Sequence, residues 1–371
     1  MLVGVPREIK NREFRVALTP SGVAELTNAG HDVVVEESAG VGSHMPDADY
    51  IAAGAKIATT AQEVWDSADL VLKVKEPVAA EYDRMREGQT LFTYLHLAAS
   101  RECTEALLRR KITSIAYETV TAPDGTLPLL APMSEVAGRL AAQVGAEAMR
   151  AGNGGRGMLL GGVPGVPPAH VVVIGGGVSG AAAAEIALGM RAQVTVLDRS
   201  LPRLRELDRA FGGRVRTVAS NALEVERAVL DADVVIGAVL VAGAKAPTLV
   251  SNDLVSRMKP GSVLVDIAID QGGCFADSRP TTHDSPTYPV HDSVFYCVAN
   301  MPGAVPNTST LALTNATLPH VLALAKTGWR DALRQDAHLA NGLNTWAGHI
   351  THDPVAQAHG LPSVSLDEAL S

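Results

Sequence analysis

The sequence predicts an α/β protein built from two doubly wound domains. Short apolar runs bounded by turn residues alternate with helical patterns along the 371-residue chain, which is typical of βαβ units and a parallel sheet. The length suits two ordinary domains of roughly 100 to 200 residues each. At residues 175–180 a glycine-rich turn joins an apolar run to an Ala-rich helical segment, which predicts that one domain is a Rossmann fold.

The first part of the chain contains five candidate strands, at residues 2–5, 32–35, 70–74, 91–95 and 114–117. Between the first two we predict a helix with Thr19 as its N-cap, Pro20 in its first turn and Gly30 as its stop. A second helix, capped by Ser134 after Pro132, is predicted to connect this part to the next domain.

A Gly- and Pro-rich stretch at 151–168 then predicts a loop or hairpin. Six further apolar runs fit a complete dinucleotide fold, at residues 171–174, 194–197, 215–218, 234–238, 263–267 and 294–298. From about Ser309 a longer helical pattern is predicted to return to the first domain, which makes that domain discontinuous. We therefore expect domains at 1–130 with 306–371 and at 131–305, with a cleft between them; the tail after Gly328 suggests no function.

Composition excludes several classes of protein. The chain is 47% hydrophobic and 19% charged, so it is globular rather than disordered. The formal charge is −9 and no Lys/Arg block is present, which argues against a nucleic-acid partner. The three cysteines are far apart without a CxxC pair, so we expect reduced core residues and neither a disulfide framework nor a metal site.

Neither export nor membrane insertion is indicated. Charge follows too soon after Met1 for a signal peptide. The one membrane-like window, residues 171–190, holds five glycines and Glu185, which suit a buried strand, turn and helix better than a lipid-facing helix. The sequence therefore predicts a cytoplasmic protein with no membrane partner.

The glycine-rich turn has the GxGxxG pattern in its proper context. Gly175 permits the tight turn, Gly177 lets the backbone approach a pyrophosphate, and Gly180 lets the helix pack close to the strand. Asp198 follows the next strand, 23 residues after Gly175, where a carboxylate accepts hydrogen bonds from ribose hydroxyls. A dinucleotide site is the favoured interpretation; a purely structural turn, with Asp198 as a helix cap, is the alternative.

Four polar residues follow predicted strands, where ligands of open α/β sheets bind. They are Arg15, Lys75, His96 and Asp270. Taken singly, Arg15 and Lys75 suit surface charges, His96 a buried histidine and Asp270 a turn or capping acid. Their shared placement at strand ends favours a site for a small molecule beside the nucleotide.

Several segments resemble the alanine dehydrogenase family, within the wider family that includes nicotinamide nucleotide transhydrogenase. They are GVPREIKNREFRVALTP at 4–20, VLKVKEP at 71–77, LFTYLHLA at 91–98, APMSEVAGRLAAQVGA at 131–146 and VLVDIAIDQGGC at 263–274. With the glycine loop and the run at 298–302, the resemblance covers about residues 1–324.

The resemblance implies reversible oxidative deamination of L-alanine to pyruvate and ammonium with reduction of NAD, by a homohexamer. Segments 1–130 and 306–371 would form the substrate domain, and 131–305 the Rossmann NAD-binding domain. Arg15 and Lys75 would bind the substrate, and His96 and Asp270 would be catalytic. The residues that would line the cofactor are Ser134, Gly175, Gly177, Val178, Gly180, Asp198, Arg203, Ser220, Val239, Leu240, Ile267, Asp270, Asn300 and Met301.

Three other functions fit parts of the pattern. A transhydrogenase component shares the glycine loop and the basic N-terminal segments, although such chains commonly continue into membrane helices. A saccharopine-forming dehydrogenase has a related two-domain plan. An NAD-binding sensor would keep the fold, but it would not need both His96 and Asp270.

Overall fold

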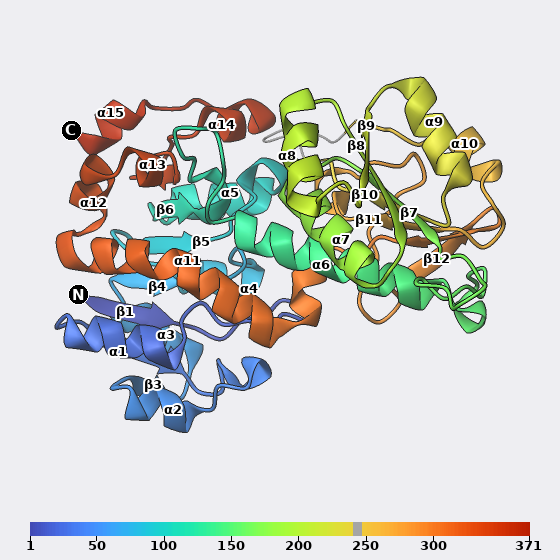
Figure 1. Ribbon diagram of the computed structural model, residues 1–371. Helices are drawn as coiled ribbons and strands as arrows, with labels where there is room; N and C mark the ends of the chain where they lie inside the picture. Colours follow the sequence, from blue (N-terminus) through green and yellow to red (C-terminus); the bar gives the residue numbers. More distant parts are fainter. Residues whose placement is uncertain (240–246) are drawn as a thin grey trace. The chain divides into compact units, whose positions relative to one another are not determined.

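The computed structural model describes residues 1–239 and 247–371, which divide into two compact units (Figure 1). The first comprises Met1–Met133 and Val305–Ser371, and the second comprises Ser134–Ala304. Each unit contains one predominantly parallel sheet whose strands are connected by helices. The predicted fold class, two doubly wound domains of which one is discontinuous, is thereby confirmed. Among the described residues, no helix is long and apolar enough to cross a membrane.

The second unit contains a seven-stranded sheet. Its strands are β7 (His170–Ile174), β8 (Gln193–Asp198), β9 (Arg216–Ala219), β10 (Val234–Gly237), β11 (Val263–Asp266), β12 (Thr287–Val290) and β13 (Ser293–Tyr296). The order β12-β13-β11-β10-β7-β8-β9 places the six parallel strands in the 3-2-1-4-5-6 arrangement of dinucleotide folds. All six predicted strands are present within two residues at each end. The antiparallel edge strand β12 was not predicted; it contains Pro289, which only an edge strand tolerates.

The helices of the second unit follow its strands. They are α7 (Val178–Gly189), α8 (Leu201–Phe211), α9 (Ala222–Asp231) and α10 (Asn252–Ser256), with short 3₁₀ turns η4 (Ala151–Asn153), η5 (Ile269–Gln271) and η6 (Met301–Ala304). Strand β7 is buried along its whole length, as expected of a central parallel strand with helices on both faces.

The first unit repeats the same strand order. Its strands are β1 (Leu2–Val5), β2 (Asp32–Glu36), β3 (Lys56–Ala58), β4 (Leu70–Leu72), β5 (Thr90–Thr93), β6 (Thr113–Ala116), β14 (Leu343–Trp346) and β15 (His349–Ile350). In the order β15-β14-β6-β5-β4-β1-β2-β3, β14 lies antiparallel to β6 and extends the sheet with residues of the C-terminal tail. The five predicted strands are confirmed, whereas β3, β14 and β15 were not predicted. Strands β3 and β15 are too short to show a period in the sequence, and β14 owes its place to pairing with β6.

The helices of the first unit come from both ends of the chain. They are α1 (Pro20–Asn28), α2 (Asp47–Ala52), α3 (Ala61–Ser67), α4 (Ala79–Tyr82), α5 (Arg101–Arg109), α11 (Pro306–Thr327), α12 (Trp329–Gln335), α13 (Ala337–Ala340), α14 (Asp353–His359) and α15 (Leu366–Leu370), with the 3₁₀ turns η1 (Val41–Ser43), η2 (Leu97–Ala99) and η3 (Tyr117–Thr119). The predicted start and end of α1 are confirmed. The Thr19 side chain accepts a hydrogen bond from the Gly22 N–H, and Gly30, just after the helix, has a φ of +84°.

The connecting helix α6 (Ala131–Ala148) begins four residues earlier than a helix capped by Ser134 would. Ser134 therefore lies inside its first turn and is not the N-cap. Pro132 is compatible with this start, because the first N–H groups of a helix have no partner within the helix and a missing one costs little.

The long helix α11 packs on the first unit, as predicted. Thr310 Oγ1 accepts the Val16 N–H at 3.1 Å and lies 2.8 Å from Ser43 Oγ. The Asn307 amide donates to the Ser43 carbonyl at 2.8 Å. The C-terminal part of the chain thus completes the first unit through buried hydrogen bonds as well as apolar packing.

The three cysteines are free and buried, as expected. Burial raises the pKa of the Cys103 and Cys274 thiols to about 12 and that of Cys297 to about 11. A thiol in such surroundings carries little thiolate near neutral pH and is a poor nucleophile.

A buried cation joins three segments of the first unit. The fully buried Lys73, directly after β4, places its Nζ 3.0 Å from Glu8 Oε2 and 2.9 Å from Glu81 Oε1. Burial opposes the charge on Lys73, but the two carboxylates outweigh it and raise the pKa of Lys73. Burial also raises the pKa of Glu8, although Lys73 acts in the opposite direction. Removing one member of such a group leaves buried charge without compensation.

We expect Lys73→Met, which keeps much of the side-chain volume, to destabilise the first unit by about 3 to 5 kcal/mol, because Glu8 and Glu81 are left buried without a cation. All three tryptophans, Trp65, Trp329 and Trp346, belong to this unit, so urea unfolding followed by tryptophan fluorescence measures it selectively.

The loss should shrink from about pH 8 to about pH 5.5, because a carboxyl whose folded pKa is raised takes up a proton in the folded state as the pH falls. Lys111→Met is the matched control, since Lys111 pairs with Glu87 at the surface, where the side chains are 51% and 70% exposed. Equal effects of the two variants would contradict a structural role for the buried cation.

Candidate active site

Three predicted site residues lie at the carboxyl edge of the first unit's sheet. Arg15 is in the segment after β1, Lys75 follows β4 and His96 follows β5. Because β5, β4 and β1 are parallel neighbours in the sheet, their carboxyl ends are at the same edge. This edge is where open α/β sheets bind ligands.

The Arg15 guanidinium is buried and firmly held. Its Nε and Nη2 donate to the two carboxylate oxygens of Glu13 at 2.6 and 2.5 Å, and Nη1 lies 3.1 Å from Met133 Sδ. Burial alone would lower the pKa of Arg15, but the charge of Glu13 and its hydrogen bonds raise it. The site thus holds a permanent, oriented cation in dry surroundings.

A pocket of about 480 Å³ opens beside Arg15, a size that suits a small molecule. Its lining combines charged groups with exposed apolar side chains, and comprises Arg7, Glu8, Ile9, Lys10, Glu13, Phe14, Arg15, Ser38, Ala39, Val41 and Gly42. All of these residues come from the segment after β1 and the segment after β2.

The backbone of Lys75 is fixed from two sides. Glu8 Oε1 accepts the N–H groups of Val74 and Lys75 at 2.6 and 3.3 Å, and Thr93 Oγ1 donates to the Lys75 carbonyl at 3.1 Å. The Lys75 side chain is half-buried. Glu8 therefore serves both the buried Lys73 and the segment that carries Lys75.

The neighbouring carboxylate, Glu76, is ion-paired with Lys10. Burial works to raise the pKa of Glu76, but the bond from Lys10 and the charges of Lys75, Lys10 and His96 lower it. The carboxylate is thus kept ionised among cationic groups.

His96 occupies a backbone conformation that residues with a Cβ rarely adopt, with a φ of +49°. Its imidazole is 40% exposed and stacks on Tyr94, with ring centroids 6.0 Å apart and an interplanar angle of 5°. The buried Tyr94 hydroxyl donates to the Leu129 carbonyl at 2.6 Å. Burial raises the pKa of Tyr94, and the charge of Arg15 acts in the opposite direction.

The structure therefore brings Arg15, Lys75 and His96 to one edge of one sheet. Tyr94 stacks on His96 and interacts electrostatically with Arg15. Glu8 also interacts electrostatically with Arg15, and its carboxylate accepts the Lys75 N–H. Sequence reasoning missed Glu8, Glu13, Tyr94 and Glu118. Their position after strands β1, β5 and β6 was the available signal, but nothing in the sequence says which residue of a loop points inward.

In the second unit, the glycine loop has the geometry of a phosphate cradle. Gly175 has a φ of +100°, and a Cβ there would lie 2.7 Å from the Ala238 carbonyl oxygen. A Cβ on Gly180 would lie 1.8 Å from the Gly175 oxygen, so only glycine allows helix and loop to approach this closely. A Cβ on Gly177 would meet nothing within 4 Å, which leaves that backbone open. No side chain caps the 12-residue helix α7, whose second residue is Ser179, so its first N–H groups are available to an anion.

Asp198 lies beside this loop at the end of β8. Its Oδ2 accepts the Gly176 N–H at 2.7 Å, and its Oδ1 accepts the Ser200 N–H at 2.7 Å. Arg203 Nε donates to the Gly176 carbonyl at 2.6 Å, and its Nη1 donates to Glu206 at 2.9 Å. The carboxylate is thus placed where the ribose of a dinucleotide would lie.

The remaining predicted cofactor residues also follow strands of this sheet. Ser220, after β9, donates its N–H to the Asp198 carbonyl at 2.9 Å, and Ile267, after β11, donates its N–H to the Gly237 carbonyl at 2.9 Å. Val239 follows β10, with its Cγ2 2.8 Å from where a Cβ on Gly175 would be. Asp270 lies in η5, and Leu240 lies outside the described residues.

Two further predicted residues follow β13. Asn300 has a φ of +66°, and its carbonyl accepts a bond from His283 Nε2 at 3.1 Å. Met301 begins η6 and is buried in the core of this unit.

Ser134 approaches the loop from the connecting helix. It lies one turn before Gly138, where a Cβ would be 2.1 Å from the Ser179 carbonyl oxygen. Helix α6 therefore packs against the first turn of α7 at this point. Val178 begins α7 and is exposed.

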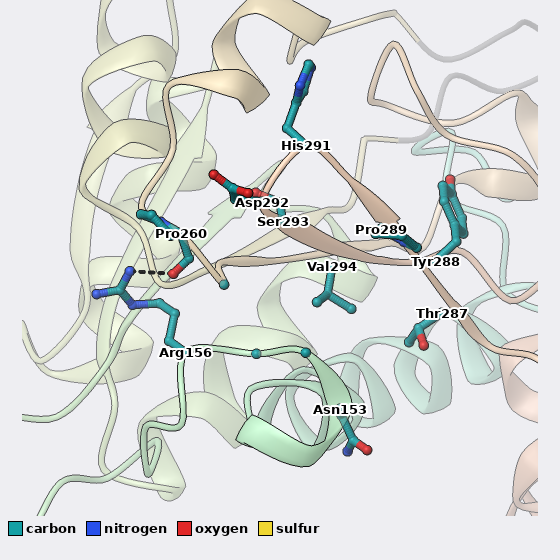
Figure 2. Close-up of a pocket in the computed structure, with 13 residues that line it drawn as sticks. Asn153, Arg156, Pro260, Thr287, Tyr288, Pro289, His291, Asp292, Ser293 and Val294 are labelled. Atoms are coloured by element: carbon teal, nitrogen blue, oxygen red, sulfur yellow. Dashed lines mark hydrogen bonds between the residues drawn. The ribbon is translucent and has the colours of Figure 1, made fainter.

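A second pocket, of about 640 Å³, lies at the opposite edge of the same sheet (Figure 2). Gly261 precedes β11, and Asp292 and Ser293 mark the start of β13, so this is the amino edge. In Figure 2 the Arg156 guanidinium turns to the Pro260 carbonyl, to which it donates at 2.8 Å, and it also pairs with Asp233. The glycine loop lies at the carboxyl edge of this sheet and the pocket at its amino edge, so we do not assign the nucleotide to the pocket. Within the described ranges, no group of three His, Cys, Asp or Glu side chains could hold a metal ion.

Comparison with known proteins agrees with this arrangement. The family model "Alanine dehydrogenase/PNT, N-terminal domain" matches residues 4–137, and "Alanine dehydrogenase/PNT, C-terminal domain" matches residues 141–353. The alanine dehydrogenase of Mycolicibacterium smegmatis is 63% identical over the whole of both chains, and that of Mycobacterium tuberculosis strain CDC 1551 is 65% identical over 98% of each.

Two solved structures are similar in fold. A structure titled L-alanine dehydrogenase has a TM-score of 0.94 and 53% identity, with 97% of this chain and 99% of the other covered. A transhydrogenase from Sinorhizobium meliloti has a TM-score of 0.80 and 26% identity, with coverages of 95% and 99%. With the two matched domains spanning most of the sequence and relatives above 60% identity along its length, the chain belongs to the alanine dehydrogenase/PNT family.

Proposed function

We propose that this protein is an NAD-dependent L-alanine dehydrogenase. The observation that carries the proposal is the pocket beside the buried Arg15, with Lys75 and His96 at the same sheet edge, in a chain whose second unit holds a nucleotide loop. The reaction converts L-alanine, water and oxidised NAD to pyruvate, ammonium, NADH and a proton, and is reversible.

Arg15 binds the substrate carboxylate in this proposal. Glu13 accepts bonds from Nε and Nη2 and so fixes the plane of the guanidinium, which lines the pocket and offers its positive charge to a substrate carboxylate. An arginine suits this role better than a lysine, because its planar fork matches two carboxylate oxygens. Lys75 polarises the substrate carbonyl as it forms, with its backbone fixed by Glu8 and Thr93.

When bound, the nicotinamide ring accepts the hydride that leaves the substrate Cα. The protein supplies the acid and base. His96 takes and returns the proton that is exchanged with water and the substrate, because imidazole can do both near neutral pH. Asp270 orients the water that attacks the substrate iminium, and its charge stabilises that cation.

The alternatives have less support. A transhydrogenase component is disfavoured by the level of identity, which is 26% to the transhydrogenase structure and 63% to the M. smegmatis alanine dehydrogenase. A saccharopine-forming dehydrogenase is disfavoured because relatives above 60% identity along the whole chain are alanine dehydrogenases. A sensor without turnover does not explain a histidine held in a strained conformation at the site.

We also propose a homo-oligomer, a hexamer by family resemblance, that works in the cytoplasm. The Gly- and Pro-rich segment at 151–168 exposes three large apolar side chains, Leu159, Val163 and Val166, with 68%, 53% and 57% of their surface accessible. Such exposure is unusual for a monomer and suits contact with another subunit.

NADH absorbance tests the function directly. We expect L-alanine to support NAD reduction well above other amino acids, and pyruvate with ammonium to support NADH oxidation. L-Glutamate, L-lysine and glycine serve as comparison substrates. A folded, NADH-binding sample that turns over none of them would refute the proposal.

His96→Ala and Asp270→Asn should each lower kcat about a hundredfold or more, as the loss of a positioned acid or base usually does. NADH should still bind the His96 variant, because His96 belongs to the first unit and the glycine loop to the second. Near-normal turnover of His96→Ala would mean that the histidine is structural.

Cofactor choice depends on which charge dominates beside the ribose. Asp198 accepts hydrogen bonds from free hydroxyls, each worth about 1.5 to 3 kcal/mol, and it repels a 2′-phosphate. Arg203 would attract that phosphate, but it already donates to Gly176 and Glu206, and an exposed ion pair is worth under about 1 kcal/mol. The Asp198 carboxylate should therefore outweigh Arg203 and favour the free ribose hydroxyls of NAD.

We expect a preference for NAD over NADP of about a hundredfold or more in kcat/KM, since this corresponds to roughly 2.8 kcal/mol. Asp198→Ala should relax it by weakening NAD use and freeing Arg199 and Arg203 to attract the phosphate. Steady-state rates with both cofactors for wild type and variant measure this. Equal efficiencies in the wild type would show that the arginines dominate.

A further inference from the structure

Glu118 lies directly against the backbone of His96. It is in η3, after β6, and its side chain is only 14% exposed. One carboxylate oxygen, Oε1, accepts the N–H groups of His96 at 2.6 Å and Leu95 at 3.1 Å. Oε2 lies 3.2 Å from the Leu95 nitrogen. The carboxylate therefore closes the turn in which His96 takes its left-handed conformation.

The same oxygen also faces the imidazole. Glu118 Oε1 lies 3.8 Å from His96 Nδ1, which is within ion-pair range of a protonated ring. Tyr94 stacks on the ring, so the imidazole has a flat support on one face and a carboxylate at one nitrogen. At 3.8 Å the carboxylate acts on the ring through its charge, and the hydrogen bond that positions His96 is the one from its backbone N–H.

We propose that Glu118 is the positioning residue of His96: it fixes the backbone from which the imidazole projects, and its charge stabilises the imidazolium that forms when the ring takes a proton. This is the arrangement of base and orienting carboxylate that general-base catalysis uses on unrelated folds. The inference rests on the proposed catalytic role of His96. It adds that the charge of Glu118 belongs to the reaction and not only to the turn.

Other charged groups surround the pair and have to be considered. Glu76, after β4, interacts electrostatically with His96, and it is itself paired with Lys10 and close to Lys75. His352, the N-cap of α14, is largely buried and interacts with Glu118, and burial lowers the pKa of His352. Of these carboxylates, Glu118 is the one with an oxygen on both the backbone N–H and the side chain of His96.

The test is Glu118→Gln, which keeps the side-chain volume and an amide oxygen to accept the two N–H groups but removes the charge. We expect kcat for alanine oxidation to fall about tenfold to a hundredfold, as the loss of a supporting carboxylate usually produces. We also expect the acid limb of the kcat/KM profile to move to lower pH by about half a unit or more, because the imidazolium loses its counter-charge. The affinity for NADH should not change.

A role confined to the turn predicts a different result. Glu118→Gln would then change the thermal midpoint without moving the pH profile, and that outcome would overturn the proposal. Glu105→Gln is the control for loss of a carboxylate elsewhere in the same unit, because Glu105 pairs with Arg101 on the exposed side of α5. It should leave kcat and the pH profile unchanged.

A second pair of variants covers the case in which Glu118→Gln does not fold. Glu118→Asp and Glu118→Asn are both one methylene shorter and differ only in charge, so the position of the acid limb should separate them, with the aspartate variant at the wild-type pH. Identical pH profiles of the two variants would contradict the proposal. So would the finding that only the aspartate variant folds, because the charge would then serve folding and not the reaction. If wild type lacks alanine turnover or His96→Ala keeps it, the proposed function fails; if both behave as expected but Glu118→Gln is normal, only this inference fails.

Discussion

A single buried cation, Lys73, joins the segments on which the first unit's candidate site is built. Strands β1 and β4 are neighbours where the strand order reverses, and Lys73 at the end of β4 binds Glu8 from the segment after β1 and Glu81 from α4. The second oxygen of Glu8 then holds the N–H groups of Val74 and Lys75. The pocket beside Arg15 and the Lys75 backbone thus depend on a buried ion cluster.

The second unit has the same order of parallel strands, but a glycine loop and not a buried ion cluster lies where its strand order reverses. Its first strand, β7, leads into a loop whose glycines let the backbone of α7 and β10 approach to distances that any side chain would prevent. One sheet therefore presents side-chain charges at its reversal point, and the other presents backbone N–H groups. In the proposed function this difference suits one sheet to a small carboxylate and the other to a pyrophosphate, although the topology is shared.

Much of this could be predicted from the sequence, because strands, glycine loops and strand-end polar residues leave local patterns. The parallel strands of the two sheets were predicted, apart from the three-residue β3, whereas the antiparallel edge strand β12 was not. The tail was not, because β14 and β15 owe their structure to pairing with β6 rather than to any period of their own. Glu13 and Glu118 were missed for a related reason: a carboxylate that binds an arginine or a backbone N–H has no signature in the sequence, and only the fold determines its partner.

The conformation of His96 has a consequence for how the protein can change. A left-handed backbone costs a residue with a Cβ on the order of 1 kcal/mol, a cost that glycine avoids and asparagine partly avoids. Selection for stability alone would therefore replace this histidine, and random substitution toward glycine or asparagine would relieve strain while it removed the imidazole. With the proposed role of His96, stability and activity are opposed at position 96, and a descendant selected for stability alone could relieve the strain there only by losing the imidazole.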